Sequence, residues 1–115
     1  MKYMYDFELD KVYDGDTIYG WIHTDAGFNV KNVMYKKLRL FGIQAPEIKT
    51  KDLVEKAAGL VSKDWLVKRL AGKKITVHSK KDKTGKYGRV LAEIYVGDDH
   101  IQTEMLEKGL AEVYE

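Results

Sequence analysis

The sequence has 115 residues, 44% of them hydrophobic, and a formal net charge of +2. A chain of this length can bury one hydrophobic core but not two, so we expect residues 1–115 to form a single domain. The absence of cysteine excludes disulfides and thiolate metal sites, and no apolar run approaches the roughly 20 residues that span a bilayer.

Three sequential strands are predicted in the first part of the chain. Alternating acidic and apolar residues, and then segments rich in β-branched and aromatic residues, place them within residues 5–9, 18–22 and 33–41. Asp14-Gly15 is a strong turn signal between the first two strands, and residues 24–27 supply the second reversal.

A helix is predicted to follow, from Asp52 to about Ala71. Asp52 and Glu55 form a capping-type start, and Gly72 is a stop signal. An amphipathic helix packs its apolar face on the core. The apolar residues that fall on one face here are Val54, Ala57, Ala58, Val61, Trp65 and Leu66.

The remaining sequence predicts two more strands, at 75–78 and 90–96, and a short helix at 101–108 that ends at Gly109. Five strands with a helix inserted after the third, and a short C-terminal helix, make a mainly β, α+β fold. This order matches the OB-fold, a five-stranded Greek-key barrel that commonly binds nucleic acid or oligosaccharide.

Positive charge is concentrated in the connection between the last two strands. Five basic residues crowd one ten-residue segment, while the chain beyond Asp98 is acidic; the five are Lys80, Lys81, Lys83, Lys86 and Arg89. Two interpretations stay open at this point. The segment is either a solvated loop or a surface that follows a nucleic-acid backbone.

Three short segments carry the candidate chemistry: VYDGDT at 12–17, LRLFGIQAPE at 38–47 and KYGR at 86–89. They contain carboxylates able to hold a cation, two arginines able to grip a phosphate and one further glutamate. Together these groups suit metal-assisted phosphodiester cleavage. Taken singly they have simpler interpretations: a polar hairpin turn, arginines at the ends of surface strands and a solvated loop glutamate.

In this order, the three segments resemble the staphylococcal nuclease (thermonuclease-like) family, over about Asp6 to Tyr114. The connections at 25–37 and 50–59 are most similar to phage- and prophage-encoded, minimal members. The resemblance implies that the five strands close into a barrel. It also implies a nuclease active site made from the three segments.

The resemblance implies a metal site with Asp16 as a direct ligand, Asp14 orienting it, and the backbone carbonyl of Ala45 as a further ligand. Where the family has its second carboxylate ligand, this chain has Gln44. A neutral amide oxygen still coordinates, but it lowers the charge of the site and hence its affinity for a divalent cation. Hard oxygen donors favour Ca²⁺, with Mg²⁺ or another hard divalent ion as the alternative.

The family roles of the other residues concern the phosphate and the attacking water. Arg39 would grip the phosphate in the ground and transition states, and Arg89 would act in the transition state and toward the leaving group. Glu47 would be the general base or the group that orients water. Lys86 and Tyr87 would contact a nucleotide phosphate, and Tyr114 would offer a base-stacking platform.

The sequence therefore predicts a calcium-dependent phosphodiesterase that hydrolyses DNA or RNA, leaving 3′-phosphate and 5′-hydroxyl ends as the family does. The alternatives are a weak or inactive OB-fold module that binds single-stranded nucleic acid, and a protein-interaction domain. The retained Asp16, Arg39, Glu47 and Arg89 favour the enzyme, whereas Gln44 favours the binding modules. We expect a monomer without a membrane partner. Because residues 1–6 lack the apolar stretch of a secretory signal, we also expect a cytoplasmic location.

Overall fold

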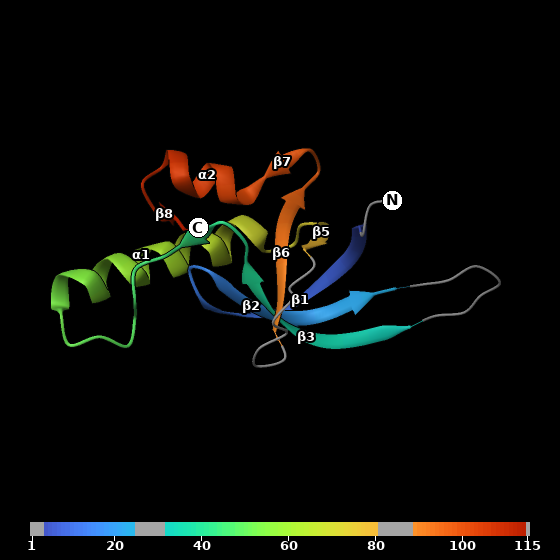
Figure 1. The fold of residues 1–115 in the computed structure, drawn as a ribbon, viewed down its shortest axis with the longest axis horizontal. Helices are drawn as coiled ribbons and strands as arrows, with labels where there is room; N and C mark the ends of the chain where they lie inside the picture. The colour runs from blue at the N-terminus through green and yellow to red at the C-terminus, as the bar shows by residue number, and fades with distance from the viewer. Residues whose placement is uncertain (1–3, 25–31, 81–88, 115) are drawn as a thin grey trace.

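The computed structural model describes residues 4–24, 32–80 and 89–114, with the backbone alone at residue 89. Its elements follow one another along the chain as coloured in Figure 1. They are β1 (Met4–Asp14), β2 (Thr17–His23), β3 (Val33–Leu40), β4 (Ile43–Gln44), α1 (Leu53–Leu70), β5 (Ile75–Lys80), β6 (Arg89–Val96), β7 (Asp99–His100), α2 (Ile101–Glu107) and β8 (Glu112–Val113). Neither helix in the described ranges is long and apolar enough to cross a membrane.

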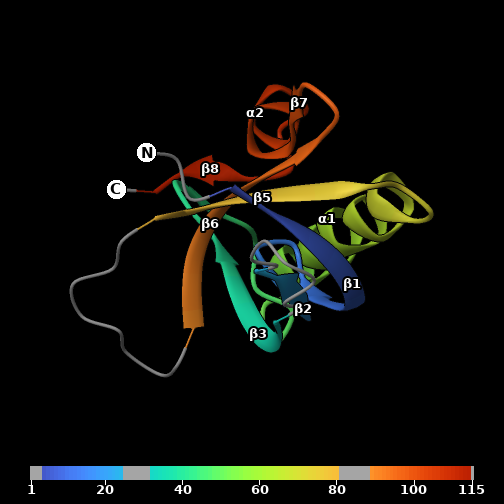
Figure 2. The same cartoon turned by 90° about the vertical axis from the view of Figure 1, so that its right-hand side faces the viewer.

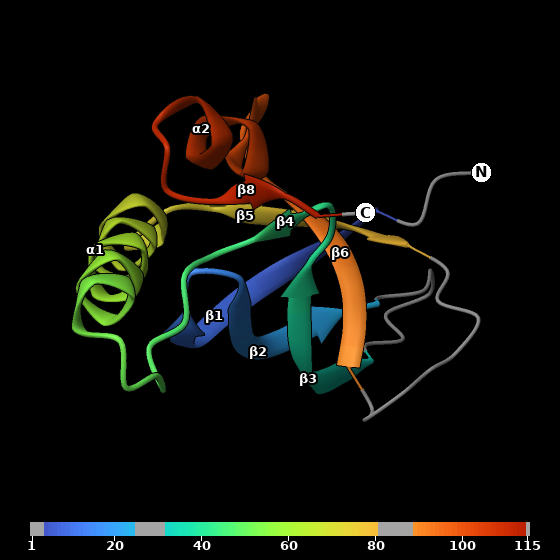
Figure 3. The same ribbon diagram turned by 60° about the vertical axis from the view of Figure 1, so that its left-hand side comes forward.

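The five long strands close into a mixed barrel. β1 pairs antiparallel with β2 and β5, β2 with β3, and β5 with β6. A parallel pairing of β3 with β6 closes the ring, and these two strands lie side by side in Figure 3. The predicted α+β fold is thus confirmed. The short strands β4, β7 and β8 were not predicted, because two residues are too few to show an alternating pattern.

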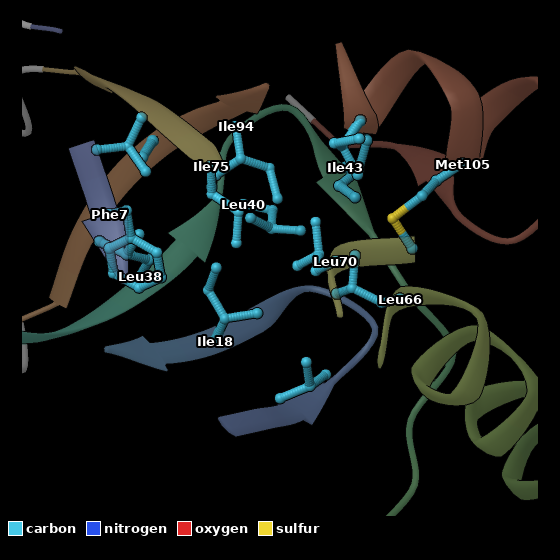
Figure 4. Close-up of a cluster of buried hydrophobic side chains, with 14 of the residues drawn as sticks. Phe7, Ile18, Leu38, Leu40, Ile43, Leu66, Leu70, Ile75, Ile94 and Met105 are labelled. Atoms are coloured by element: carbon cyan, nitrogen blue, oxygen red, sulfur yellow. The ribbon is translucent and has the colours of Figure 1, made fainter. Parts of the chain in front are cut away.

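The helices lie outside the barrel, as Figure 2 shows from a second side. α1 packs against β1, and α2 packs against β6. Side chains from the strands and both helices meet in the hydrophobic core drawn in Figure 4. Its largest fully buried members include Ile18, Leu38, Leu40, Leu66 and Met105.

Strand β1 changes its inward-facing positions part of the way along. Phe7 is buried, but further on it is Val12 that is buried, and the register with β2 shifts between Leu9 and Lys11. A β-bulge of this kind inserts one extra residue and reverses the faces beyond it. Lys11 and Tyr13 consequently lie on the outer surface.

The start and end of α1 agree with the prediction. An Asp52 carboxylate oxygen accepts hydrogen bonds from the backbone N–H groups of Val54 (3.0 Å) and Glu55 (3.2 Å). The helix ends at Leu70, two residues before Gly72, whose φ of 68° is the left-handed conformation that glycine favours.

The predicted packing face of α1 is largely wrong. Leu66 is buried as expected and Trp65 packs at the edge of the core, but Val54 is 81% exposed and Val61 is 59% exposed. The buried residues of α1 are Gly59, Ser62, Leu66 and Leu70. Small residues contribute little to a hydrophobic pattern. Gly59 and Ser62 lie on the buried face because small side chains let the helix approach the barrel and its loops closely.

Candidate active site

An open pocket of about 680 Å³ lies where the turn between β1 and β2 meets the loop after β4. Seven of the residues predicted to form the site line this pocket: Asp14, Asp16, Arg39, Gln44, Ala45, Glu47 and Tyr114. Lys86, Tyr87 and the side chain of Arg89 lie outside the described residues. The backbone of Arg89 pairs with Lys37, two residues from Arg39.

Asp16 is buried at the centre of this arrangement. One of its carboxylate oxygens, Oδ2, accepts a hydrogen bond of 2.9 Å from the backbone N–H of Ala45, and Oδ1 accepts one of 3.1 Å from the Thr17 hydroxyl. Its backbone carbonyl accepts a further bond from the N–H of Leu40. The β1–β2 turn, the end of β3 and the loop after β4 are therefore fastened to one residue.

Asp14 lies next to Asp16 and shares its electrostatic environment. The backbone N–H of Asp16 donates a hydrogen bond of 3.0 Å to Asp14 Oδ1. Burial, followed by the hydrogen bond and charge of the Asp16 carboxylate, raises the pKa of Asp14 to about 6. Two carboxylates held so close favour either a proton or a cation between them.

Arg39 is held in place by three groups. Its Nη1 donates to the backbone carbonyls of Leu40 (3.1 Å) and Ile43 (3.0 Å), and lies 3.5 Å from Asp16 Oδ2. The guanidinium also lies 5.7 Å from the centre of the Tyr114 ring, a cation–π distance. Arg39 is thus fixed at the pocket before any ligand binds, which reduces the entropy lost on binding an anion.

The end of β4 and the loop after it carry two further predicted site residues, Gln44 and Glu47. Glu47 is exposed, and its backbone N–H donates a 3.1 Å hydrogen bond to Glu55 at the start of α1. Gln44 is exposed and pairs across the β4–β8 ladder with Glu112. Glu112 lines a neighbouring pocket rather than the one that contains Asp16.

Basic side chains surround these acidic residues. Five basic and three acidic residues line the pocket, and the basic ones are Lys11, Lys37, Arg39, Lys49 and Lys63. They come from β1, β3, the loop after β4 and α1, segments far apart in the sequence. A pocket with an acidic centre and a basic rim can accommodate a cation and a polyanion together.

Two glycines that the sequence analysis did not assign to the site bring its parts together. A Cβ on Gly15 would lie 2.6 Å from the Cβ of Ala45, and a Cβ on Gly59 would lie 2.8 Å from the carbonyl oxygen of Pro46. Gly15 does not adopt the left-handed conformation, so the turn needs a glycine here for space. The signal for Gly59 was a glycine in the middle of a helix, which normally lowers helix stability.

We expect Gly59→Ala to displace the Pro46–Glu47 segment. Alanine favours the helix by about 1 kcal/mol, but crowding against two backbone carbonyls costs about 1–3 kcal/mol. The free energy of unfolding should therefore fall slightly, and the rate of any reaction that this pocket supports should fall by roughly tenfold or more because reacting groups tolerate little misplacement. Thermal melts and reaction rates would measure both. Lys56→Ala, an exposed change in the same helix, should alter neither; equal activity in all three proteins would contradict the packing role.

The pocket's donor set suits a hard divalent cation. It offers carboxylate oxygens from Asp14, Asp16 and Glu47, an amide oxygen from Gln44 and the backbone carbonyl of Ala45. Within the described ranges no three histidine, cysteine, aspartate or glutamate residues are grouped closely enough to hold a metal by themselves. A cation bound here would take part of its coordination from neutral oxygens.

Several known proteins are similar in sequence to this chain. The chain is 35% identical over 95 residues to an uncharacterized 38.1 kDa protein of Capnoides sempervirens, covering 76% of this chain and 26% of the relative. It is 26% identical over 103 residues to the thermonuclease of Staphylococcus intermedius, covering 90% of this chain and 56% of that protein. For the thermonuclease of Staphylococcus hyicus the identity is 26% over 105 residues, with 91% and 57% covered.

The chain thus spans about a quarter of the first relative and little more than half of each thermonuclease. Residues 37–115 also match the family described as "Staphylococcal nuclease homologue". That match runs from within β3, through the Arg39 and Glu47 segments, to the end of the chain. Since it covers well over half of the sequence, the chain belongs to the staphylococcal nuclease homologue family.

Proposed function

We propose that this protein is a metal-dependent nuclease that hydrolyses phosphodiester bonds of DNA or RNA. The observation that carries the proposal is the Asp16–Arg39 pair, with 3.5 Å between Nη1 and Oδ2, in a pocket with a basic rim. A carboxylate for a cation and a guanidinium for a phosphate lie side by side there. Both groups stabilise the charge that develops on a phosphodiester during hydrolysis when they lie close to the same phosphorus atom.

Each side chain has a distinct role in the proposed reaction. Arg39 binds two oxygens of the scissile phosphate and stabilises the negative charge that grows as water attacks phosphorus. Glu47 accepts a hydrogen bond from that water, orients it and takes up its proton, while the bond from phosphorus to the leaving oxygen breaks and that oxygen is protonated from solvent water. A calcium ion held by Asp16, Gln44 and Ala45 would neutralise phosphate charge. Arg89, whose backbone begins the neighbouring strand β6, and Lys86 are proposed to assist.

A weak or inactive binding module is the second candidate function. It is favoured by Gln44, which supplies a neutral amide where the family has a carboxylate ligand. Glu112, which lies opposite Gln44, does not line the pocket that contains Asp16 and so does not replace the missing charge. With one anionic ligand fewer, the cation site binds less tightly. Both candidates predict nucleic-acid binding, and they differ in whether the bound strand is cut.

We expect cleavage of a labelled single-stranded oligonucleotide in calcium and none in chelator, because Asp16 and Arg39 cannot neutralise the phosphate without the cation. Glu47→Gln should lower turnover by about a hundredfold or more. Glu107→Gln, on the exposed end of α2, serves as the matched control. Phosphatase-sensitive 3′ ends on the fragments would identify the products. Undiminished cleavage in chelator would contradict the metal dependence, and undiminished cleavage by Glu47→Gln would contradict the role of Glu47.

A further inference from the structure

The outer face of β1, β2 and β3 carries a continuous row of aromatic side chains. Tyr13 meets Tyr19 edge to face at 6.5 Å between ring centroids, and Tyr19 lies 6.3 Å from Tyr35 with the ring planes 24° apart. Trp21 meets Tyr35 at 5.2 Å. We call these four residues the aromatic row.

The strands place these rings together. In β2, Ile18 and Ile22 are buried, so the alternate residues Tyr19 and Trp21 point outward. Trp21 lies directly opposite Tyr35 of β3 in the antiparallel ladder. The bulge in β1 turns Tyr13 to the same outer surface.

Three lysines accompany the rings. The ammonium of Lys11 lies 5.0 Å from the Tyr19 ring centre, and that of Lys37 lies 5.9 Å from the same ring. Lys49 lies 5.4 Å from the Tyr13 ring. Lys11 and Lys37 are the two residues paired with Tyr19 across the sheet, so this ring has a cation on either side.

The aromatic row leads into the pocket. Lys11, Tyr13, Lys37 and Lys49 line the pocket that contains Asp16 and Arg39. Ring–ring contacts between strands add about 0.5–1.5 kcal/mol each to a sheet, which accounts for the pairs alone. Sheet stabilisation does not explain why the Tyr13 and Tyr35 rings remain 41% and 46% exposed. It also does not explain why lysines flank the rings or why the aromatic row continues into the pocket.

We propose that the aromatic row and Lys11, Lys37 and Lys49 form a subsite for single-stranded nucleic acid that extends from the active site. Unpaired bases would stack on the tyrosine rings and the ammonium groups would follow the phosphates. A duplex keeps its bases stacked on one another and offers no free faces to these rings. The subsite rests on the proposed function for its choice of ligand, but binding is measured separately from cleavage.

Acidic residues limit the length of this subsite. The Tyr35 hydroxyl donates a 2.6 Å hydrogen bond to Asp10 Oδ2, and Glu8 lies opposite Trp21 in the β1–β2 ladder. A phosphate beyond Tyr35 would meet both carboxylates. Arg39 and Tyr35 are four residues apart along β3, which corresponds to about 13 Å. The bound nucleic acid would therefore contact this surface over a few nucleotides only.

The test compares oligothymidylates of 2 and 12 nucleotides, by fluorescence anisotropy in chelator. Tyr19→Ala/Tyr35→Ala should raise the Kd of the 12-mer roughly 5- to 100-fold, from the usual stacking energy per base, while the Kd of the 2-mer, which is too short to leave the pocket, changes less than about twofold. Tyr19→Phe/Tyr35→Phe keeps the rings and should bind like the parent. Tyr95→Ala, on β6 away from the row, should have no effect.

A second pair of variants keeps the proposal testable if the alanine protein unfolds. Lys11→Ala/Lys37→Ala should flatten the dependence of log K on log salt by about 1.4, near 0.7 for each phosphate on single strands. Two results in Tyr19→Ala/Tyr35→Ala would overturn the subsite: an unchanged Kd for the 12-mer, or an equal loss of affinity for both lengths. Tighter binding of duplex than of single strands by the parent protein, or binding of a neutral oligosaccharide instead, would overturn it as well.

The two proposals fail in different ways. If the parent protein cleaves nucleic acid but 12-mer binding does not depend on the aromatic row, the subsite is wrong and the nuclease proposal is retained. If no ion supports cleavage while 12-mer binding depends on Tyr19 and Tyr35, the nuclease is wrong and the subsite stands.

Discussion

Replacing Arg39 by alanine is expected to lower kcat/KM on an oligonucleotide by at least about a hundredfold, since loss of one preorganised donor to a developing oxyanion costs about 2.7–4 kcal/mol. Two observations raise the expectation for this residue. Its guanidinium is already held by the carbonyls of Leu40 and Ile43, and it is the positive charge beside Asp16. Arg39→Lys should recover only a small part of the rate, because lysine lacks the planar fork that holds two oxygens.

The matched control for Arg39 is Arg69, an arginine of α1 in a different network. Its Nε donates to Glu104 at 2.8 Å, and its Nη2 donates to Asp99 at 2.9 Å. Arg69→Ala should lower the melting temperature and leave kcat/KM nearly unchanged for the folded protein. If Arg39→Ala kept more than about a tenth of the parent rate, the loss would be too small for a group that stabilises the transition state.

Replacing Gln44 by aspartate is expected to tighten calcium binding by roughly tenfold or more, which corresponds to about 1.4 kcal/mol, because affinity in oxygen-ligand sites rises with ligand charge. Cleavage at limiting calcium should rise in parallel. Without metal the variant should be slightly less stable, since the new carboxylate would repel Asp16 and Asp14, whose pKa is already raised by burial and by the neighbouring Asp16 carboxylate. Calorimetric calcium titration and thermal melts would measure both effects.

Two variants separate charge from other effects at position 44. Gln44→Asn has the same reach as aspartate without its charge and should not tighten binding. Glu112→Gln removes the carboxylate opposite Gln44, and it should leave calcium affinity unchanged because Glu112 does not line the pocket that contains Asp16. An unaltered calcium affinity in Gln44→Asp would show that position 44 does not face the ion.

The sequence was sufficient for features that depend on neighbours along the chain. The alternation in the long strands, the Asp52 cap and the glycine stops after both helices all reflect backbone preferences within a few residues. The three motifs also identified the family, because their residue types and their order can be read from the sequence without knowing how the segments pack. The catalytic, metal-binding and substrate-binding roles of all the predicted site residues, the calcium dependence, the single domain, the monomer, the cytoplasmic location and the likeness to phage-encoded members remain predictions.

Tertiary structure decided what depends on distant segments. The hydrogen bond from the Ala45 N–H to Asp16 joins residues 29 positions apart, and the parallel β3–β6 pairing closes the barrel across the intervening helix. The packing face of α1 was determined by the room at Gly59 and Ser62 rather than by its apolar residues. The bulge in β1 determined which side chains join the aromatic row. Such contacts follow from shape and space between segments, which a local hydrophobic period does not record.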